Sequence, residues 1–209
     1  MSSTSTAATT IKVAATLAFA LTLSNARCQA LPEGWRASGA TPKEYKMTRT
    51  AQARYKGEFG ASIVHESGSG QGFGTIMQAV NAASFRGQRV ALRAWIRTND
   101  AESAQMWLRI DGSSQVISMD NMDDRPIKGT MPWKEYEIVM SVPESATHLA
   151  FGVFLSGKGS LAFDEVRIGV APASARLTTI YDHTNKPLEG PFTPMKNVLE
   201  APSNMSLEK

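Results

Sequence analysis

The chain has 209 residues, of which 42% are hydrophobic and 20% are charged, and it contains one cysteine, Cys28. This composition is typical of one globular domain, and it excludes a collagen-like chain, a cysteine-based zinc ribbon and a small disulfide scaffold. The formal net charge is +3, and residues 1–30 carry Lys12 and Arg27 but no acidic side chain. Without them the charge is nearly balanced, so we expect no basic surface and no nucleic-acid partner.

The N-terminus has the pattern of a secretory signal. Lys12 precedes a largely apolar run of eleven residues, 13–23 (VAATLAFALTL). That run is too short to cross the roughly 30 Å hydrocarbon core of a bilayer. Small-residue cleavage patterns follow at 24–26 and at 28–30. The sequence therefore predicts a signal peptide over residues 1–30 and a periplasmic or secreted protein that does not span the membrane.

Residues 31–170 form a series of short segments in which apolar residues alternate with polar ones. Residues 89–97 (RVALRAWIR) and 104–111 (AQMWLRID) alternate most clearly, which is the pattern of strands with one buried face. Further predicted strands cover residues 45–50, 61–66, 73–80, 115–119, 134–142, 148–155 and 161–170. Because no helical period separates them, we expect an all-β fold, an antiparallel β-sandwich with jelly-roll connections.

Residues 171–209 differ in character from the predicted sandwich. This segment contains five prolines and no alternation longer than residues 177–181. Its composition predicts a mostly extended, proline-rich tail.

Two long blocks carry a family resemblance, residues 72–98 (GFGTIMQAVNAASFRGQRVALRAWIRT) and residues 119–168, together with the opening PEGW at 32–35. They resemble bacterial jelly-roll domains of the galactose-binding-like, carbohydrate-binding-module type. The resemblance covers about two thirds of the chain. It implies an accessory module that binds carbohydrate or another cell-envelope polymer rather than an enzyme, although fold alone does not transfer function.

Each of the two clearest strands carries a tryptophan between polar side chains. The candidate ligand-binding residues are therefore Gln105, Trp107 and Arg109 on one strand and Arg93, Trp95 and Arg97 on the other. An exposed indole stacks on the apolar face of a sugar while guanidinium and amide groups bond its hydroxyls, and we expect both tryptophans on one sheet face. The alternative is that both rings pack beneath a loop or a second layer.

Two acidic features are candidates for calcium. In related sugar-binding jelly rolls an aspartate of the final strand helps to hold a structural calcium, which the resemblance places at Asp164. Residues 119–130 also cluster Asp120, Asp123 and Asp124, but Arg125 beside them favours a loop held by internal hydrogen bonds.

The sequence contains no catalytic motif, so we expect no enzyme. The competing functions are a structural or protein-interaction module of the envelope and, more weakly, a hydrolase or its accessory domain.

Overall fold

The computed structural model describes residues 30–179 and 192–209, and within them the regular secondary structure is almost entirely β-strand. Three short 3₁₀ turns, η1 (Pro42–Glu44), η2 (Ala51–Ala53) and η3 (Ala83–Phe85), interrupt the strands. The strands are β1 (Arg36–Gly39), β2 (Tyr45–Thr50), β3 (Gly60–His65), β4 (Phe73–Asn81), β5 (Arg89–Asp111), β6 (Val116–Asp120), β7 (Ile127–Ser141), β8 (His148–Ser156) and β9 (Ser160–Ala171). All paired strands are antiparallel, which confirms the predicted fold class.

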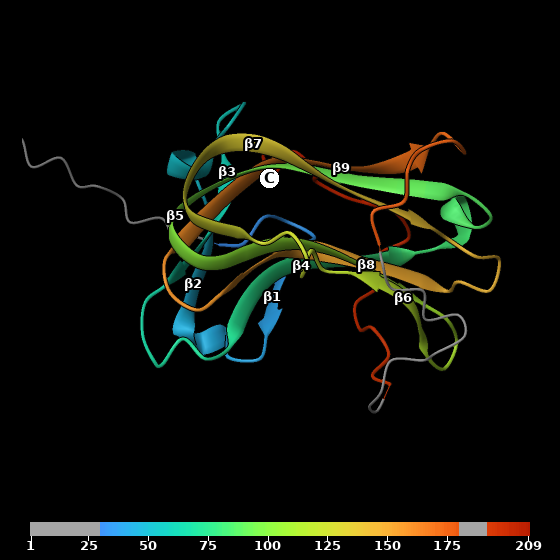
Figure 1. Cartoon of the computed structure of the whole chain (residues 1–209), viewed down its shortest axis with the longest axis horizontal. Helices are drawn as coiled ribbons and strands as arrows, with labels where there is room; N and C mark the ends of the chain where they lie inside the picture. Colours follow the sequence, from blue (N-terminus) through green and yellow to red (C-terminus); the bar gives the residue numbers. More distant parts are fainter. Residues whose placement is uncertain (1–29, 180–191) are drawn as a thin grey trace, which may run out of the picture.

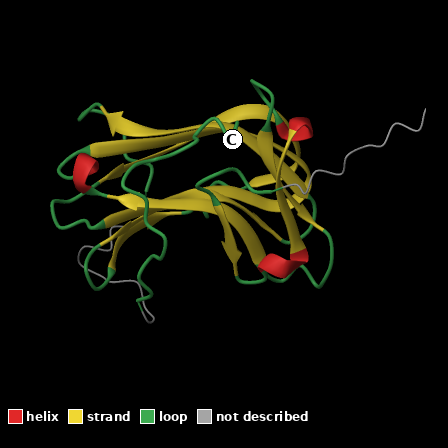
Figure 2. Cartoon of the chain, turned by 180° about the vertical axis from the view of Figure 1, so that it is seen from behind, coloured by secondary structure: helices red, strands yellow, loops and turns green. Residues whose placement is uncertain are grey.

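The strands form two layers (Figure 1). One layer, which we call the β9 sheet, contains β2, β3, β9, the first half of β5 and most of β7. The other, the β8 sheet, contains β1, β4, β8, β6 and the second half of β5. The view from behind shows the same two layers with loops closing both ends (Figure 2). This arrangement is the predicted sandwich.

Strand β5 belongs to both sheets. Around residues 89–99 it pairs with β7 and β9, and around residues 103–111 it pairs with β8 and β6. The strand changes layers near Asp100, which has a φ of 48°. Gly159 packs closely there, because a Cβ at this glycine would lie 2.2 Å from the carbonyl oxygen of Asp100. The two strands predicted at 89–97 and 104–111 are therefore two halves of one 23-residue strand.

The core lies between the two sheets. Trp35 contacts Phe151 and Phe163 with ring centroids 5.9 and 6.0 Å apart. Around these rings lie fully buried aliphatic side chains, namely Ile63, Ile76, Leu92, Ile96, Met106, Leu108, Ile110 and Ile138. Burial of each such side chain contributes roughly 1.5–3 kcal/mol to folding. Their alternation along each strand fixes which side chains point outward.

The described end of the chain has no regular strand but packs on the sandwich. Leu207 is fully buried in the core, and the backbone N–H of Val166 donates to the carbonyl of Met205 at 3.0 Å. Leu199 forms a parallel bridge to Val80. In Figures 1 and 2 the marked C-terminus lies between the levels of the two layers, whereas Met195 packs beside Trp107 on the β8 sheet. Residues 192–209 thus form irregular structure that packs on the sandwich.

The predicted signal peptide falls almost wholly on residues 1–29, outside the described residues. Neither it nor the predicted export is tested by the structure. Across residues 30–179 and 192–209, no helix has both the length and the apolar character needed to span a bilayer.

Candidate functional site

The two tryptophans face opposite sides of the molecule, which corrects the prediction that they share one face. Both indoles point away from the core, as their positions in the alternation require. However, Trp95 lies on the half of β5 that belongs to the β9 sheet, and Trp107 lies on the half that belongs to the β8 sheet. Because the strand changes layers between them, Trp95, Arg93 and Arg97 form no common site with Trp107 and Arg109.

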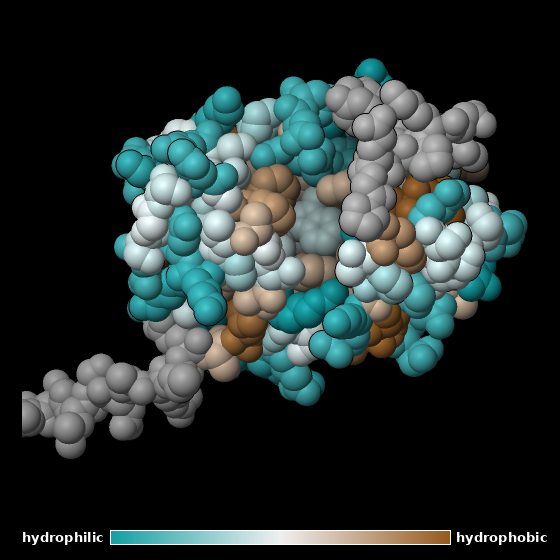
Figure 3. Space-filling view, turned by 90° about the horizontal axis from the view of Figure 1, so that it is seen from below, coloured by the Kyte–Doolittle hydropathy of each residue, from teal (hydrophilic) through white to brown (hydrophobic). Residues whose placement is uncertain are grey.

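A groove crosses the outer face of the β8 sheet, and we call it the Trp107 groove. Its volume is about 690 Å³. It is lined by Arg36, Ser38, Gly39, Ala40, Phe73, Thr75, Met77, Trp107, Arg109, Met119, Asn121, Phe154, Thr193, Pro194 and Met195. Figure 3, which views the molecule from below, shows a hollow in this face with hydrophobic surface along its rim.

The indole of Trp107 is held at a fixed orientation in the groove. Its Nε1 donates to Oγ1 of Thr75 at 3.0 Å, and Thr75 in turn donates to the carbonyl of Val153 at 2.9 Å. The ring packs on Met77, and Met195 from the C-terminal segment covers part of this cluster. Only 8% of Trp107 is exposed. The ring is therefore a partly covered floor of the groove rather than a free platform.

Arg109 places a cation beside the indole. Its guanidinium donates to Oδ2 of Asp111 at 2.7 Å and to the carbonyl of Thr193 at 3.4 Å. Burial raises the pKa of Asp111 above its usual value, and the hydrogen bond from Arg109 opposes that rise. Nε of Arg109 and Oδ1 of Asp111 are buried without a protein partner. Of this pair only Arg109 lines the groove, where it places a cationic side chain next to the aromatic floor.

Gln105 does not line the groove, although the sequence analysis named it as a ligand-binding residue. Its amide donates to the carbonyl of Asn121 at 2.8 Å and to Oδ1 of Asp123 at 3.0 Å. Asn121 is itself a lining residue, so Gln105 acts by positioning the groove rim. A role of this kind depends on a contact between distant segments, which alternation along one strand does not reveal.

The acidic loop after β6 is held internally, as the sequence analysis favoured. Arg125 pairs with Asp120 at 2.7 Å and with Asp124 at 2.6 Å. The backbone N–H of Met122 donates to the side chain of Asp120. These bonds fix the loop that carries Asn121.

On the β9 sheet, loop residues cover the outward indole. Tyr55 stacks on Trp95 at 4.0 Å with an interplanar angle of 11°, and it also contacts Trp133. Arg97 lies over the Trp133 ring at 5.3 Å, while Arg93 forms an ion pair with Glu137. The sequence analysis missed Tyr55 and Trp133, since neither lies on the strands that it singled out.

Asp164 anchors the loop that carries Tyr55. Its carboxylate is fully buried and accepts three backbone N–H groups, from Tyr55 at 2.8 Å, Lys56 at 2.9 Å and Glu165 at 2.6 Å. Burial raises the pKa of Asp164, and these hydrogen bonds oppose the rise. The surroundings of Asp164 supply N–H donors rather than the oxygens that calcium requires, so they do not fit this ion. Among the described residues, no three His, Cys, Asp or Glu side chains gather closely enough to hold a metal.

Comparison with known proteins gives one sequence relative and a clear structural class. No family model matches the chain. The chain is 32% identical over 183 residues to the uncharacterized HTH-type transcriptional regulator YbfP of Bacillus subtilis, and it spans only 57% of that protein's length.

Solved structures share the fold, and two of them illustrate it. One is the enzymatically active domain of bacteriophage CBA120 tailspike protein 4, with a TM-score of 0.53 and 14% identity over 66% of this chain and 20% of that one. The other is the CBM22-1 xylan-binding domain of Paenibacillus barcinonensis Xyn10C, with a TM-score of 0.51 and 13% identity over 70% of this chain and 91% of that one. The protein therefore has the β-sandwich fold of carbohydrate-binding modules, as the sequence resemblance implied.

Proposed function

We propose that this protein is an exported, non-catalytic module that binds carbohydrate, or another polymer of the cell envelope, in the Trp107 groove. The observation that carries the proposal is the groove itself. It combines the fixed indole of Trp107 with the rings of Phe73 and Phe154, whose centroids lie 5.5 Å apart, and with the guanidinium of Arg109.

The chemistry of the groove suits a sugar chain. The apolar faces of sugar rings pack on aromatic rings, and the guanidinium and amide groups of Arg109 and Asn121 donate to hydroxyls. We expect a modest binding energy, taking as a guide the roughly 1–3 kcal/mol that a nucleobase contributes when it stacks on an aromatic side chain. We therefore expect micromolar or weaker affinity unless several sugar units are bound together.

The shared fold supports this proposal without deciding it. The xylan-binding domain shows that a sandwich of this type holds a polysaccharide in another protein. The relative from Bacillus subtilis is a transcriptional regulator by its name, and the match covers only 57% of that protein. Export rests on the signal pattern of residues 1–30.

The proposal is tested by replacing two exposed side chains, one on each sheet. Phe73, which is 37% exposed, lines the groove, whereas Met131, which is 39% exposed, lies on β7 of the other sheet. On a glycan array followed by calorimetry, we expect Phe73→Ala to weaken binding of the best neutral glycan about fivefold or more, since it removes a stacking surface. The matched control Met131→Ala should bind as the natural protein does.

Two results would overturn the proposal. One is the absence of any glycan ligand combined with specific capture of an envelope protein, which would favour a protein-interaction module. The other is glycan turnover that is lost on mutation of one carboxylate, which would establish an enzyme.

A further inference from the structure

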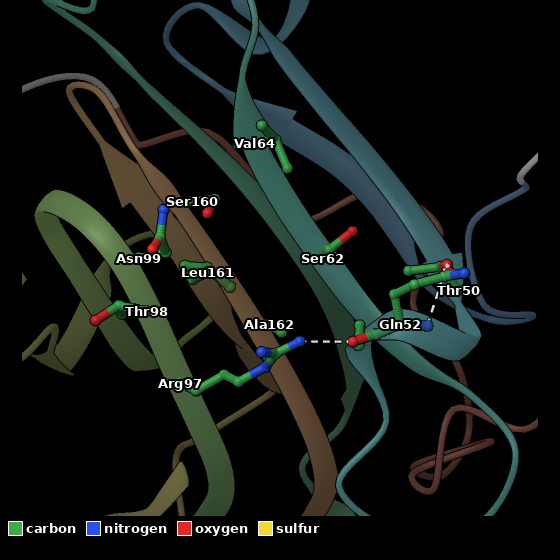
Figure 4. Close-up of a pocket in the computed structure, with 11 residues that line it drawn as sticks. Thr50, Gln52, Ser62, Val64, Arg97, Thr98, Asn99, Ser160, Leu161 and Ala162 are labelled. Carbon is green, nitrogen blue, oxygen red and sulfur yellow. Dashed lines mark hydrogen bonds between the residues drawn. The ribbon is translucent and has the colours of Figure 1, made fainter. Parts of the chain in front are cut away.

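A second cavity lies on the outer face of the β9 sheet, on the side opposite the Trp107 groove. Its volume is about 240 Å³, and it lies between η2 and the segment of β5 at Asn99. We call it the Arg97 pocket, after its charged residue. The polar side chains among its lining residues are Thr50, Gln52, Ser62, Arg97, Thr98, Asn99 and Ser160 (Figure 4).

Arg97 is held in place at the pocket. Its side chain extends from β5 across β9 towards η2, where its guanidinium donates to the backbone carbonyl of Gln52 at 2.6 Å (Figure 4). The guanidinium also lies 5.3 Å from the centroid of the Trp133 ring. These two contacts limit its motion, and a fixed guanidinium loses less conformational entropy when a ligand binds.

The positive charge of Arg97 has no acidic partner in the pocket. No carboxylate is among the lining residues. The acidic side chains of β7 are occupied elsewhere on the same face, since Glu135 pairs with Arg167 and Glu137 pairs with Arg93. Within the part of the chain that the structure describes, no ion pair is formed by Arg97.

The remaining lining groups are hydroxyls, amides and small apolar side chains. Ser62 and Ala162 pair across β3 and β9 beneath the pocket and leave it open. Ser and Asn side chains both donate and accept, which suits sugar hydroxyls. The pocket is about a third of the size of the Trp107 groove, so it suits a single sugar unit rather than a chain.

We propose that the Arg97 pocket is a second ligand site, which binds the carboxylate of an acidic sugar unit. This inference rests on the proposed carbohydrate-binding function. A guanidinium pairs with a planar carboxylate through two parallel N–H bonds, and the neighbouring hydroxyl and amide groups bind the ring hydroxyls. A phosphate or sulfate would match a site with several cations or converging backbone N–H groups better.

The test uses nuclear magnetic resonance titration of the isotope-labelled protein at low and high salt. The probes are an oligogalacturonate, its uncharged methyl ester, a sulfated oligosaccharide and inorganic phosphate. The oligogalacturonate should shift the amide signals of Ser62, Asn99 and Ser160, and binding should weaken as salt increases. The methyl ester should leave these signals unchanged.

Two variants of the same face provide the matched comparison. Arg97→Gln should weaken oligogalacturonate binding at the pocket about tenfold or more, because a charge-assisted hydrogen bond is lost. Arg93→Gln removes the same charge from the same strand outside the pocket, and it should leave binding within about twofold of the natural protein, as expected for a screened surface charge.

The other outcomes overturn the inference. Equal binding of the ester, tighter binding of phosphate or sulfate, or equal losses in both variants would each show that the pocket does not select an acidic sugar. A different result would overturn the proposed function, namely that no neutral glycan shifts the signals of Phe73 and Asn121 in the Trp107 groove. Binding of oligogalacturonate in the pocket would survive that failure.

Discussion

The two outer faces of the sandwich start from the same local pattern and become different surfaces. Each carries an outward indole on β5 with an arginine two residues later, Trp95 with Arg97 and Trp107 with Arg109. On the β8 sheet the indole forms the floor of a groove of about 690 Å³. On the β9 sheet Tyr55 stacks over the indole, and the cavity lies beside it. The segments that fold over a strand therefore decide which kind of site an outward tryptophan forms.

The comparison also separates the roles of the two arginines. Arg109 is paired with the buried carboxylate of Asp111, so its charge is largely balanced within the protein. Arg97 is oriented by a backbone carbonyl and an aromatic ring and keeps its charge available. We therefore expect neutral ligands at the first face and anionic ones at the second.

The largest expected effect is on stability, and it distinguishes the two indoles. Trp107→Ala should lower the free energy of unfolding by about 4 kcal/mol, since it empties a packed site under Met77 and Met195. Trp95→Ala should cost only about 1–2 kcal/mol, because Trp95 is half-buried and loses mainly its stacking with Tyr55. Urea denaturation monitored by circular dichroism measures both. Equal losses would show that the two rings are buried alike.

A smaller effect is expected at the anchor of the loop that covers Trp95. Asp164→Ala removes the acceptor of three backbone N–H groups, so the free energy of unfolding should fall by about 2–3 kcal/mol. Hydrogen exchange at Tyr55 and Lys56 should become faster, while exchange in the Trp107 groove stays unchanged. The exposed carboxylate of Glu137 on the same face provides the control. Glu137→Ala should change neither the free energy of unfolding nor the rate of hydrogen exchange at Tyr55 and Lys56. Protection that persists at Tyr55 after the Asp164 substitution would contradict the anchoring role.

The smallest expected effect is on the dependence of stability on pH, and it concerns the carboxylate that pairs with Arg109. Burial raises the pKa of Asp111 in the folded protein above its ordinary value of 3.8. Between that value and the raised pKa, the folded state binds more protons at this group than the unfolded state does. The contribution of Asp111 to stability is therefore present below pH 3.8 and is lost as the pH rises through the folded pKa.

Asp111→Asn removes this titrating group while keeping the shape of the side chain. Denaturation curves recorded across the acidic range should show a smaller loss of stability with rising pH in this variant than in the natural protein. A steeper slope in the Asp111 variant would mean that the folded pKa lies below the ordinary value instead of above it.

The sequence predicted the strands well because alternation reports which side of a strand is buried. Residues 45–50 were predicted and observed with the same bounds. Both indoles lie at outward positions of β5, where Met195 covers part of Trp107 and Tyr55 stacks on Trp95. Alternation carries no information about the layer to which a strand belongs. It therefore could not predict the passage of β5 from one sheet to the other, or the separation of the two indoles that results from it.

Contacts between distant segments account for the rest of what was missed. Tyr55 reaches Trp95 because Asp164, more than a hundred residues later, holds its backbone. Leu207 enters the core from a segment whose apolar residues are too widely spaced to show a period. Single residues of this kind gain their roles from tertiary packing alone, and local sequence patterns do not report them.

The most direct test of carbohydrate binding in the Trp107 groove is titration of the isotope-labelled protein with a neutral oligosaccharide chosen from the glycan array. Binding in the groove predicts shifts of the Trp107 indole N–H and of the Phe73 and Asn121 amides, with the Trp95 indole signal unchanged. Shifts centred on Trp95, or none at the groove under saturating ligand, would contradict it.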